Sequence, residues 1–266
     1  MGSAANIQAY PPESGQIALK DGVAPRFWVT IDTEEDFDWN GPFSRTDFRL
    51  DSVPALSACQ SYFERAGVRP IYLVDWPIVQ DDRAVAILAP ALASGRCDIG
   101  AQLHPWVTPP FDEAVNDRNS YTGNLPETLQ RAKMQTLRDG IRDRFGAAPL
   151  AYRAGRYGLG RSSAAMLADL GFRLDTSVRS GFDYRPGHGP DYRCAPLRPW
   201  WVGQGSDAIL EVPVTTVFGG ALGRLGPPVY HRVARDGLRA GAALARLGLV
   251  ERIALTPEGI PADKAC

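Results

Sequence analysis

The sequence predicts an α/β fold built around a parallel sheet. Short apolar runs rich in β-branched and aromatic residues, typical of buried strands, alternate with longer segments whose apolar residues recur at helical spacing. Several of these runs end in acidic residues, and the carboxyl ends of strands are where α/β folds gather their functional loops. Alternation of strand and helix indicates parallel pairing with right-handed crossovers. We expect about seven strands.

The expected strands follow one another along most of the chain. The first is an apolar run after Pro25 that stops abruptly at a cluster of carboxylates, and we expect it to be buried. The second also finishes in an acid, Asp75. The runs interpreted as strands are 27–31, 69–75, 97–102, 150–154, 173–178, 211–215 and 251–256.

Helices are expected between these strands. Ser52 precedes the first helix as a cap and Gly67 ends it. The helical patterns cover 53–66, 77–93, 126–145 and 162–170.

Two segments show neither the pattern of a strand nor that of a helix. Residues 103–125 are rich in Pro, Asn and Asp and are longer than an ordinary connector, which indicates a binding loop. Residues 179–207 carry many turn formers. Their aromatic residues either stack on sugar rings or pin an irregular loop, and the sequence leaves both readings open for Tyr184, Tyr192, Trp200 and Trp201.

Composition limits the classes of function. The chain has 266 residues, 44% of them hydrophobic, which suffices for one substantial core. We expect a flexible N-terminal tail at residues 1–20 and a single domain at residues 21–266. The 29 basic and 30 acidic residues nearly cancel, so no broad field would steer nucleic acid or an anionic membrane. A small or uncharged substrate fits this balance better.

Targeting signals are not expected. The N-terminus has no basic region followed by an apolar one, and no apolar run is long enough to span a membrane. The four cysteines are scattered without a CxxC pair, which favours reduced thiols over a zinc knuckle or a disulfide framework. We therefore expect a cytoplasmic protein with no membrane partner, and the sequence leaves its oligomeric state open.

Five carboxylates follow the first expected strand. Asp32, Glu34, Glu35, Asp36 and Asp38 cannot all lie close together, ionised and unpaired, so a cation, an arginine or water must compensate them. Asp32 and Glu34 are one residue apart and would face the same side of a strand. One could then take a proton from water while the other holds a metal. A solvated acidic loop that caps the next helix is an equal alternative.

Two further strand ends carry candidate residues. His104 follows the third expected strand, with Gln102 nearby, and is either a metal ligand or a hydrogen-bonded structural residue. Arg153 and Arg156 follow the fourth expected strand, where a guanidinium could orient Asp32 through a charge-assisted hydrogen bond. These arginines could equally serve only to neutralise the acids at the same edge.

Taken together, these strand ends resemble the polysaccharide deacetylase family, also called the NodB-homology or carbohydrate esterase 4 family, and particularly its WalW-like branch. The likeness covers about residues 25–256. It implies a NodB-type fold, a distorted (β/α) barrel of about seven parallel strands, and hydrolysis of an N-acetyl or related amide with a divalent metal. The motifs that carry it are VTIDTEEDFDW, IGAQLHPWVTPPF, YRAGRYG, LDTSV, LEVPVT and LTPEG.

The resemblance also implies roles for individual residues. Asp32 matches the general base of the family, and Glu34 stands where some branches place an acidic metal ligand. Arg153 matches the arginine that orients the base, and Asp175 matches a later motif near both. The backbone N–H near Tyr157 corresponds to an oxyanion donor.

Two departures from the family pattern affect these expectations. The family places two histidines four residues apart, but Gln102 and Trp106 occupy those positions here and His104 lies between them. The histidine that serves the family as general acid on its last strand is also missing, and His188 and His231 are not obvious substitutes. Because the chain stops soon after LTPEG, we expect a shortened barrel that is not fully closed at its C-terminal end.

The first functional hypothesis is a metal-dependent hydrolase that removes an acyl group from an amide nitrogen of an N-acetylated sugar or a small amide. Glu34 and His104 would hold the metal, with zinc expected and cobalt or nickel as alternatives. Asp32, Arg153 and Asp175 would be catalytic. The residues expected to contact the substrate are Gln102, Trp106, Arg156 and Tyr157.

Two alternatives remain open at this stage. A non-catalytic carbohydrate-binding relative would have kept the fold and lost the full set of ligands. A second enzyme reading replaces the sugar with a cyclic or small amide, because a protein without an export signal would meet soluble compounds.

Overall fold

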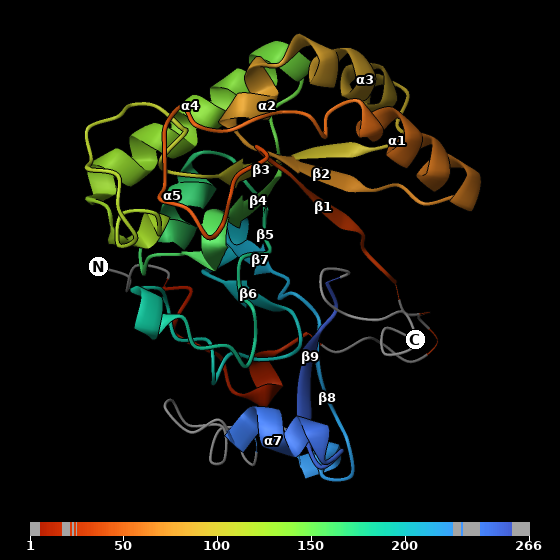
Figure 1. Cartoon of the computed structure of the whole chain (residues 1–266), viewed down its shortest axis with the longest axis vertical. Helices are drawn as coiled ribbons and strands as arrows, with labels where there is room; N and C mark the ends of the chain where they lie inside the picture. The colour runs from red at the N-terminus through yellow and green to blue at the C-terminus, as the bar shows by residue number, and fades with distance from the viewer. Residues whose placement is uncertain are drawn as a thin grey trace.

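The computed structural model describes residues 6–17, 22, 24, 26–225, 230 and 240–256. Its centre is a seven-stranded sheet with the order β1-β2-β3-β4-β5-β7-β6 (Figure 1). All neighbours pair in parallel except β6 and β7, which are antiparallel. The α/β prediction is therefore confirmed, with one antiparallel edge strand. The strands of this sheet are β1 (Thr30–Thr33), β2 (Ile71–Val74), β3 (Asp98–Leu103), β4 (Ala151–Ala154), β5 (Leu174–Asp175), β6 (Trp200–Val202) and β7 (Ile209–Glu211).

Over the described residues the sheet is open, because no pairing joins the edge strands β1 and β6. The last expected strand forms β9 (Glu251–Ala254), which pairs antiparallel with β8 (Thr216–Gly219) in a separate two-stranded sheet. We expected this segment to be a strand of the main sheet, and that prediction is wrong. The strand expected at 211–215 overlaps the observed strand β7 only at Glu211, where β7 ends. Pro213, which has no backbone N–H to donate, lies between β7 and β8.

Helices α1 (Ala55–Ala66), α2 (Trp76–Gln80), α3 (Asp82–Ala93) and α4 (Glu127–Phe145) lie together on one side of the sheet (Figure 1). Two shorter helices follow them, α5 (Ser163–Asp169) and α7 (Ala240–Arg246). The sequence predicted one helix where α2 and α3 are separate. Asp81 divides them because its backbone is extended and its carboxylate accepts the N–H groups of Arg83 and Ala84, which caps α3.

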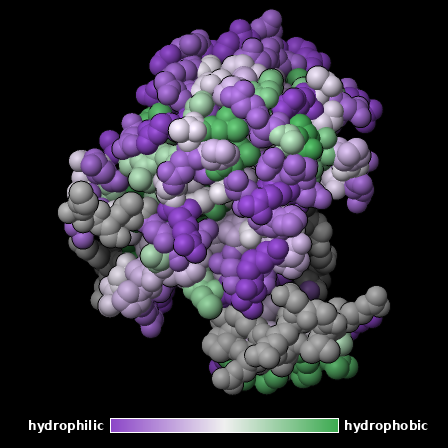
Figure 2. Space-filling view, turned by 90° about the vertical axis from the view of Figure 1, so that its left-hand side faces the viewer, coloured by the Kyte–Doolittle hydropathy of each residue, from purple (hydrophilic) through white to green (hydrophobic). Residues whose placement is uncertain are grey.

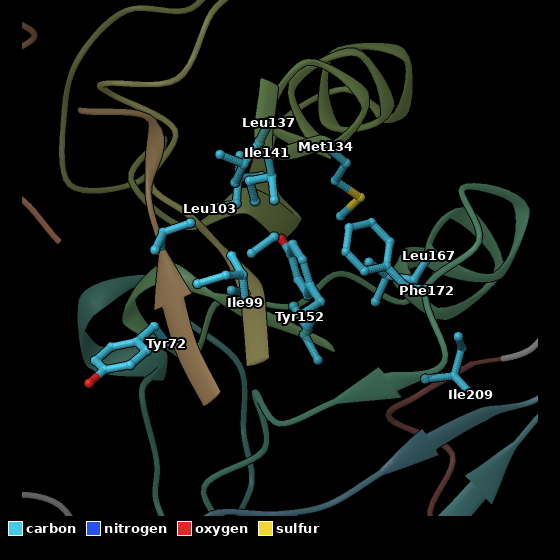
Figure 3. Close-up of a cluster of buried hydrophobic side chains, with 14 of the residues drawn as sticks. Tyr72, Ile99, Leu103, Met134, Leu137, Ile141, Tyr152, Leu167, Phe172 and Ile209 are labelled. Carbon is cyan, nitrogen blue, oxygen red and sulfur yellow. The ribbon is translucent and has the colours of Figure 1, made fainter. Parts of the chain in front are cut away.

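The hydrophobic core lies between the sheet and helices α4 and α5 (Figure 3). Met134, Leu137 and Ile141 point from α4 toward Tyr152 on β4, and all four side chains are buried. Burial of each such apolar side chain stabilises the fold by about 1.5–3 kcal/mol. This packing fixes the strands whose carboxyl ends carry the candidate site.

The N-terminal segment packs against β6. Ile7 is fully buried, the ring of Tyr10 meets that of Trp200 edge to face at 6.0 Å, and Gln16 forms a β-bridge with Trp200. Residues 6–17 of the expected tail therefore make defined contacts with the sheet. Residues 1–5 and 18–20 of the expected tail lie outside the described residues, as do His231 and the last three residues of LTPEG.

Two other aromatic assignments change. Trp200 was placed in an irregular loop, but it is buried on β6, and Trp201 beside it is exposed. Phe27 and Trp28 were expected in a buried strand, yet β1 begins only at Thr30 and both side chains are exposed. Their apolar character alone did not distinguish the strand from the segment that leads into it.

The face drawn in Figure 2 is largely hydrophilic, with apolar residues in its upper middle and at its lower end, the height at which Figure 1 places β8 and α7. Large exposed apolar side chains of this part of the chain are Val217, Leu222, Leu225 and Leu247. Within the described ranges, none of the helices combines the length and apolar character required to cross a bilayer.

Candidate active site

A pocket of about 420 Å³ opens at the carboxyl ends of β1, β3 and β4. The parallel register brings together residues that are far apart in sequence, and Gln102 lies directly beside Arg153 on the neighbouring strand. Most of the predicted site residues line the pocket. Its lining residues are Asp32, Glu34, Trp39, Gln102, His104, Tyr121, Arg153, Ala154, Arg156, Tyr157, Arg179 and Tyr184.

Asp32 and Arg153 form an ion pair in which Arg153 Nη1 donates to Asp32 Oδ1. Arg153 is buried, and three more hydrogen bonds fix its guanidinium: Nη2 donates to the hydroxyls of Thr30 (3.0 Å) and Thr176 (3.3 Å), and Nε donates to the Thr176 carbonyl (3.1 Å). The side chain of Asp32 is 31% exposed. Asp32 is thus held on one side and open on the other, the geometry that an oriented base requires.

His104 is almost fully buried, and its two ring nitrogens have different surroundings. Nδ1 lies 2.8 Å from Glu35 Oε2, and because an ionised carboxylate can only accept, Nδ1 must donate. Nε2 has no hydrogen-bond partner and lies 3.4 Å from Glu34 Oε2 at the pocket. The Glu34 oxygen also accepts from Gln102 Nε2 at 2.6 Å, which leaves Gln102 Oε1 buried without a partner.

A buried network holds His104 from behind. Trp106 stacks on the imidazole with ring centroids 4.4 Å apart, and its indole N–H donates to Glu35 Oε1 at 2.8 Å. Asp75 Oδ2 accepts the backbone N–H of Glu35 at 2.9 Å. Trp106 is buried and does not line the pocket, so it packs against the side of His104 that faces away from the pocket. It does not occupy the expected substrate-contact position.

Glu35 and Asp75 were missed as site residues by the sequence reasoning. Both stand at strand ends, Glu35 after β1 and Asp75 directly after β2, so strand-end position was the available signal. No local pattern distinguishes Glu34, which faces the pocket, from Glu35, which faces inward. That choice depends on how the chain turns after Thr33, where β1 ends.

The charges in this network are coupled. Burial, the hydrogen bond to Glu35 and the charge of Glu35 raise the pKa of Asp75 well above its ordinary value. Burial opposes the charged form of His104, but Glu35 and Glu34 outweigh it and raise the pKa of His104. Burial likewise acts against ionised Glu35, whose pKa is nevertheless lowered by the charge of His104 and by hydrogen bonds from Asp75 and His104. Positive charge beside Glu34 and Glu35 is therefore favoured.

Two sets of donors could hold a metal ion. In the first, ligand atoms of Glu35, Asp75 and His104 lie within 4.8 Å of one another, but these carboxylates are buried and already hydrogen-bonded. In the second, Glu34 and His104 Nε2 face the pocket, and their separation of 3.4 Å matches the roughly 3.3–3.4 Å between two ligands of a tetrahedral zinc site. A histidine ligand also usually donates its other N–H to a carboxylate, as Nδ1 does here. The second set fits a metal better.

The segment after β4 approaches His104 very closely. A Cβ on Gly155 would lie 2.3 Å from His104 Cδ2 and 2.7 Å from the Leu103 carbonyl oxygen, so no other residue fits. Arg156 (φ 54°) and Tyr157 (φ 60°) follow in the left-handed region, which costs about 1–3 kcal/mol each for a non-glycine residue. The Tyr192 hydroxyl holds this turn by donating to the Tyr157 carbonyl at 2.6 Å.

Asp175 does not line the pocket and is fully buried beneath it. Its carboxylate accepts from the Ser177 hydroxyl at 2.7 Å, and the cross-strand neighbour of Asp175 is Glu211. Burial raises the pKa of both carboxyls, and Asp175 further raises that of Glu211. Glu211 Oε2 has no other partner, so a protonated Glu211 that donates to Asp175 satisfies both groups. Asp175 is placed to support the loop that carries Thr176, which in turn holds Arg153.

No family model and no curated protein matches the sequence. Comparison with solved structures finds a proposed polysaccharide deacetylase from Mycobacterium smegmatis, with a TM-score of 0.43 and 18% identity over 62% of this chain and 46% of that one. A chitin deacetylase from the fungal pathogen Colletotrichum lindemuthianum gives 0.36 and 18% identity, over 56% and 53% of the two chains. A 4-alpha-glucanotransferase from Thermococcus litoralis gives 0.47 and 10% identity, over 71% and 27%.

The solved structures found in this way include deacetylases of the family that the sequence motifs resemble. The chain spans 46% and 53% of the length of the two deacetylases described above.

Proposed function

We propose that the chain is a hydrolase that removes an acetyl or related acyl group from an amide nitrogen of a carbohydrate or a small amide. The observation that carries the proposal is the unpartnered Nε2 of His104 beside Glu34, in the same pocket as the carboxylate of Asp32. A buried imidazole nitrogen without a hydrogen bond is costly unless a ligand meets it. The open carboxylate nearby supplies a base.

The metal would be held by Glu34 and His104 Nε2, with the free Gln102 Oε1 as an additional oxygen donor. A divalent cation bound there would lower the pKa of a water and polarise the amide carbonyl. Imidazole and carboxylate ligands suit zinc, and cobalt or nickel are alternatives. Glu35 would fix the orientation of His104 through Nδ1.

Asp32 would accept the proton from the attacking water. Arg153 donates to Asp32 Oδ1, which leaves Oδ2 of this partly exposed carboxylate to accept the proton. As the amide carbon becomes tetrahedral, a backbone N–H near Tyr157 would donate to the developing oxyanion. The protonated Asp32 can then return the proton to the leaving nitrogen, which balances the reaction without a second histidine.

The pocket walls favour a sugar over a smaller amide. Tyr157 and Tyr184 line the pocket and stack on each other with ring centroids 5.8 Å apart. Trp39, which is 52% exposed, lies on the same pocket lining. Flat aromatic surfaces pack well against the apolar faces of sugar rings.

Acetate release tests the proposal. The purified protein is incubated with N-acetylated chitooligosaccharides and with N-acetylglucosamine in zinc, cobalt or nickel, and we expect acetate to accumulate with one of these metals. His104→Ala should abolish both release and bound metal. His188→Asn is the matched control, since it removes the other described histidine, lies outside this pocket and keeps a residue that tolerates its left-handed backbone (φ 71°). Saccharide binding with no acetate release under any metal would instead favour the non-catalytic relative.

A further inference from the structure

Arg179 is a charged residue of the pocket that the proposed reaction does not use. It follows β5 and lines the pocket together with Tyr157 and Tyr184. Its guanidinium lies over the Phe182 ring at 4.2 Å and faces the Tyr157 ring at 5.3 Å. Aromatic faces of this kind position a guanidinium without neutralising its charge.

The hydrogen bonds of Arg179 are few and long. Nη1 lies 3.4 Å from the Tyr184 hydroxyl, Nη2 lies 3.5 Å from the Thr256 hydroxyl, and the buried Nε has no partner. In the part of the chain that the structure describes, no carboxylate lies within ion-pair distance of Arg179. A guanidinium has five N–H donors in a fixed fork, so most of its donor capacity is unused.

The other two arginines that line the pocket, Arg153 and Arg156, do not share this condition. Arg153 is paired with Asp32, and Arg156 donates to the Ser120 hydroxyl and lies 3.8 Å from Asp117. Arg252 adds positive charge beside Arg179 and also lacks a carboxylate partner among the described residues. Burial lowers the pKa of Arg252, and the like charge of Arg179 lowers it further. An anion is therefore the missing partner at this wall of the pocket.

We propose that Arg179 binds a carboxylate carried by the substrate, so that the substrate class is an N-acylated sugar acid or a small N-acyl acid. The planar fork of a guanidinium matches a carboxylate in two parallel hydrogen bonds. A monoanion fits better than a phosphate, which carries about −1.5 to −2 charges near neutral pH, because Asp32 and Glu34 line the same pocket and would repel a dianion more strongly. The reaction at the amide is that of the proposed function, on which this assignment rests for turnover only.

Paired probes that differ in one charge test the assignment. N-acetylmuramic acid and its methyl ester are compared as substrates by kcat/KM for acetate release. We expect the acid to be preferred by about 10- to 100-fold, the range of a hydrogen bond between charged groups. Arg179→Gln should bring the ratio close to one, because it lowers the rate with the acid much more than the rate with the ester. Arg173→Gln, an exposed arginine at the opposite end of β5, should keep the preference of the parent.

Arg179→Lys is the control for a loss of preference that is caused by misfolding. It keeps the charge but loses the fork, and we expect a preference between those of the parent and Arg179→Gln. Equal rates for acid and ester in the parent, or an equal fall for both probes in Arg179→Gln, would overturn the assignment.

Binding separates this inference from the proposed function. If neither probe is turned over, calorimetry on the same protein measures the affinity for each. Tighter binding of the acid that is lost in Arg179→Gln would support the carboxylate site while hydrolysis fails. Turnover of both probes with no preference for the acid would support hydrolysis while the carboxylate site fails.

Discussion

Adding one methyl group at Gly155 is expected to displace His104 and so disable the proposed metal site. The new Cβ would lie 2.3 Å from His104 Cδ2, 2.7 Å from the Leu103 carbonyl oxygen and 3.1 Å from His104 Nε2. Because the nearest contact must lengthen by roughly 1 Å to reach ordinary packing distance, the imidazole has to move relative to Glu34. Overpacking of this kind destabilises a protein by about 1–3 kcal/mol.

Two measurements follow for Gly155→Ala. Urea unfolding should show the loss of stability, and zinc titration should show an affinity lowered by about 10- to 100-fold, as for other changes that misplace a histidine ligand. Gly219→Ala is the matched control, since its nearest contact would be an ordinary 3.5 Å to Ile253 Cδ1. Zinc affinity equal to that of the parent in a folded Gly155→Ala protein would refute the reasoning.

Three further predictions concern the surrounding network and the fold. Glu35→Gln should weaken metal affinity by about 10- to 100-fold in the same titration, because the amide cannot hold the Nδ1 proton of His104 as a carboxylate does; an unchanged affinity would remove Glu35 from the site. Lys133→Met should lower the free energy of unfolding by about 3–5 kcal/mol in urea, since the fully buried ammonium is paired with a carboxylate and binds three backbone carbonyls of the 105–110 loop; a loss below 1 kcal/mol would contradict this. The hydrogen bond with Arg185 is the main cause that lowers the pKa of Asp183 to about 2. Asp183 should therefore contribute about 2 kcal/mol to the free energy of unfolding above pH 4. This contribution is lost between about pH 4 and 2, because the unfolded carboxyl binds its proton at a higher pH than the folded one. Asp183→Asn should remove that part of the acid dependence of the unfolding free energy, and an unaltered profile would refute it.

The parallel strands were predictable because their sequence pattern is local. The run 71–74 is short, apolar and followed by helical periodicity at 77–93, and this alternation along the chain identified both the strands and the α/β class from the sequence. The convergence of Asp32, His104 and Arg153 followed from the same reasoning, because each comes directly at or after a strand end. Residues at these ends must share one edge of a parallel sheet.

The features that sequence reasoning missed depend on partners far along the chain. Tyr10 packs against the Trp200 ring and Gln16 pairs with the Trp200 backbone, and nothing near Trp200 in sequence shows these contacts. The pairing of β9 with β8 in place of β1 depends on which edge is free, which a strand pattern alone does not encode. Trp106 was read as a substrate contact, although its burial against His104 is what positions the imidazole.

The central claim is that Asp32 removes a proton from water beside a bound cation, and one comparison tests it most directly. Acetate release from an N-acetylated sugar is measured for the parent and for Asp32→Asn at the same saturating metal concentration, with circular dichroism to confirm that both are folded. We predict that release falls by a factor of at least about 100, the lower range for loss of a general base, while bound metal stays near one per chain. Release by the variant at the rate of the parent would contradict the claim.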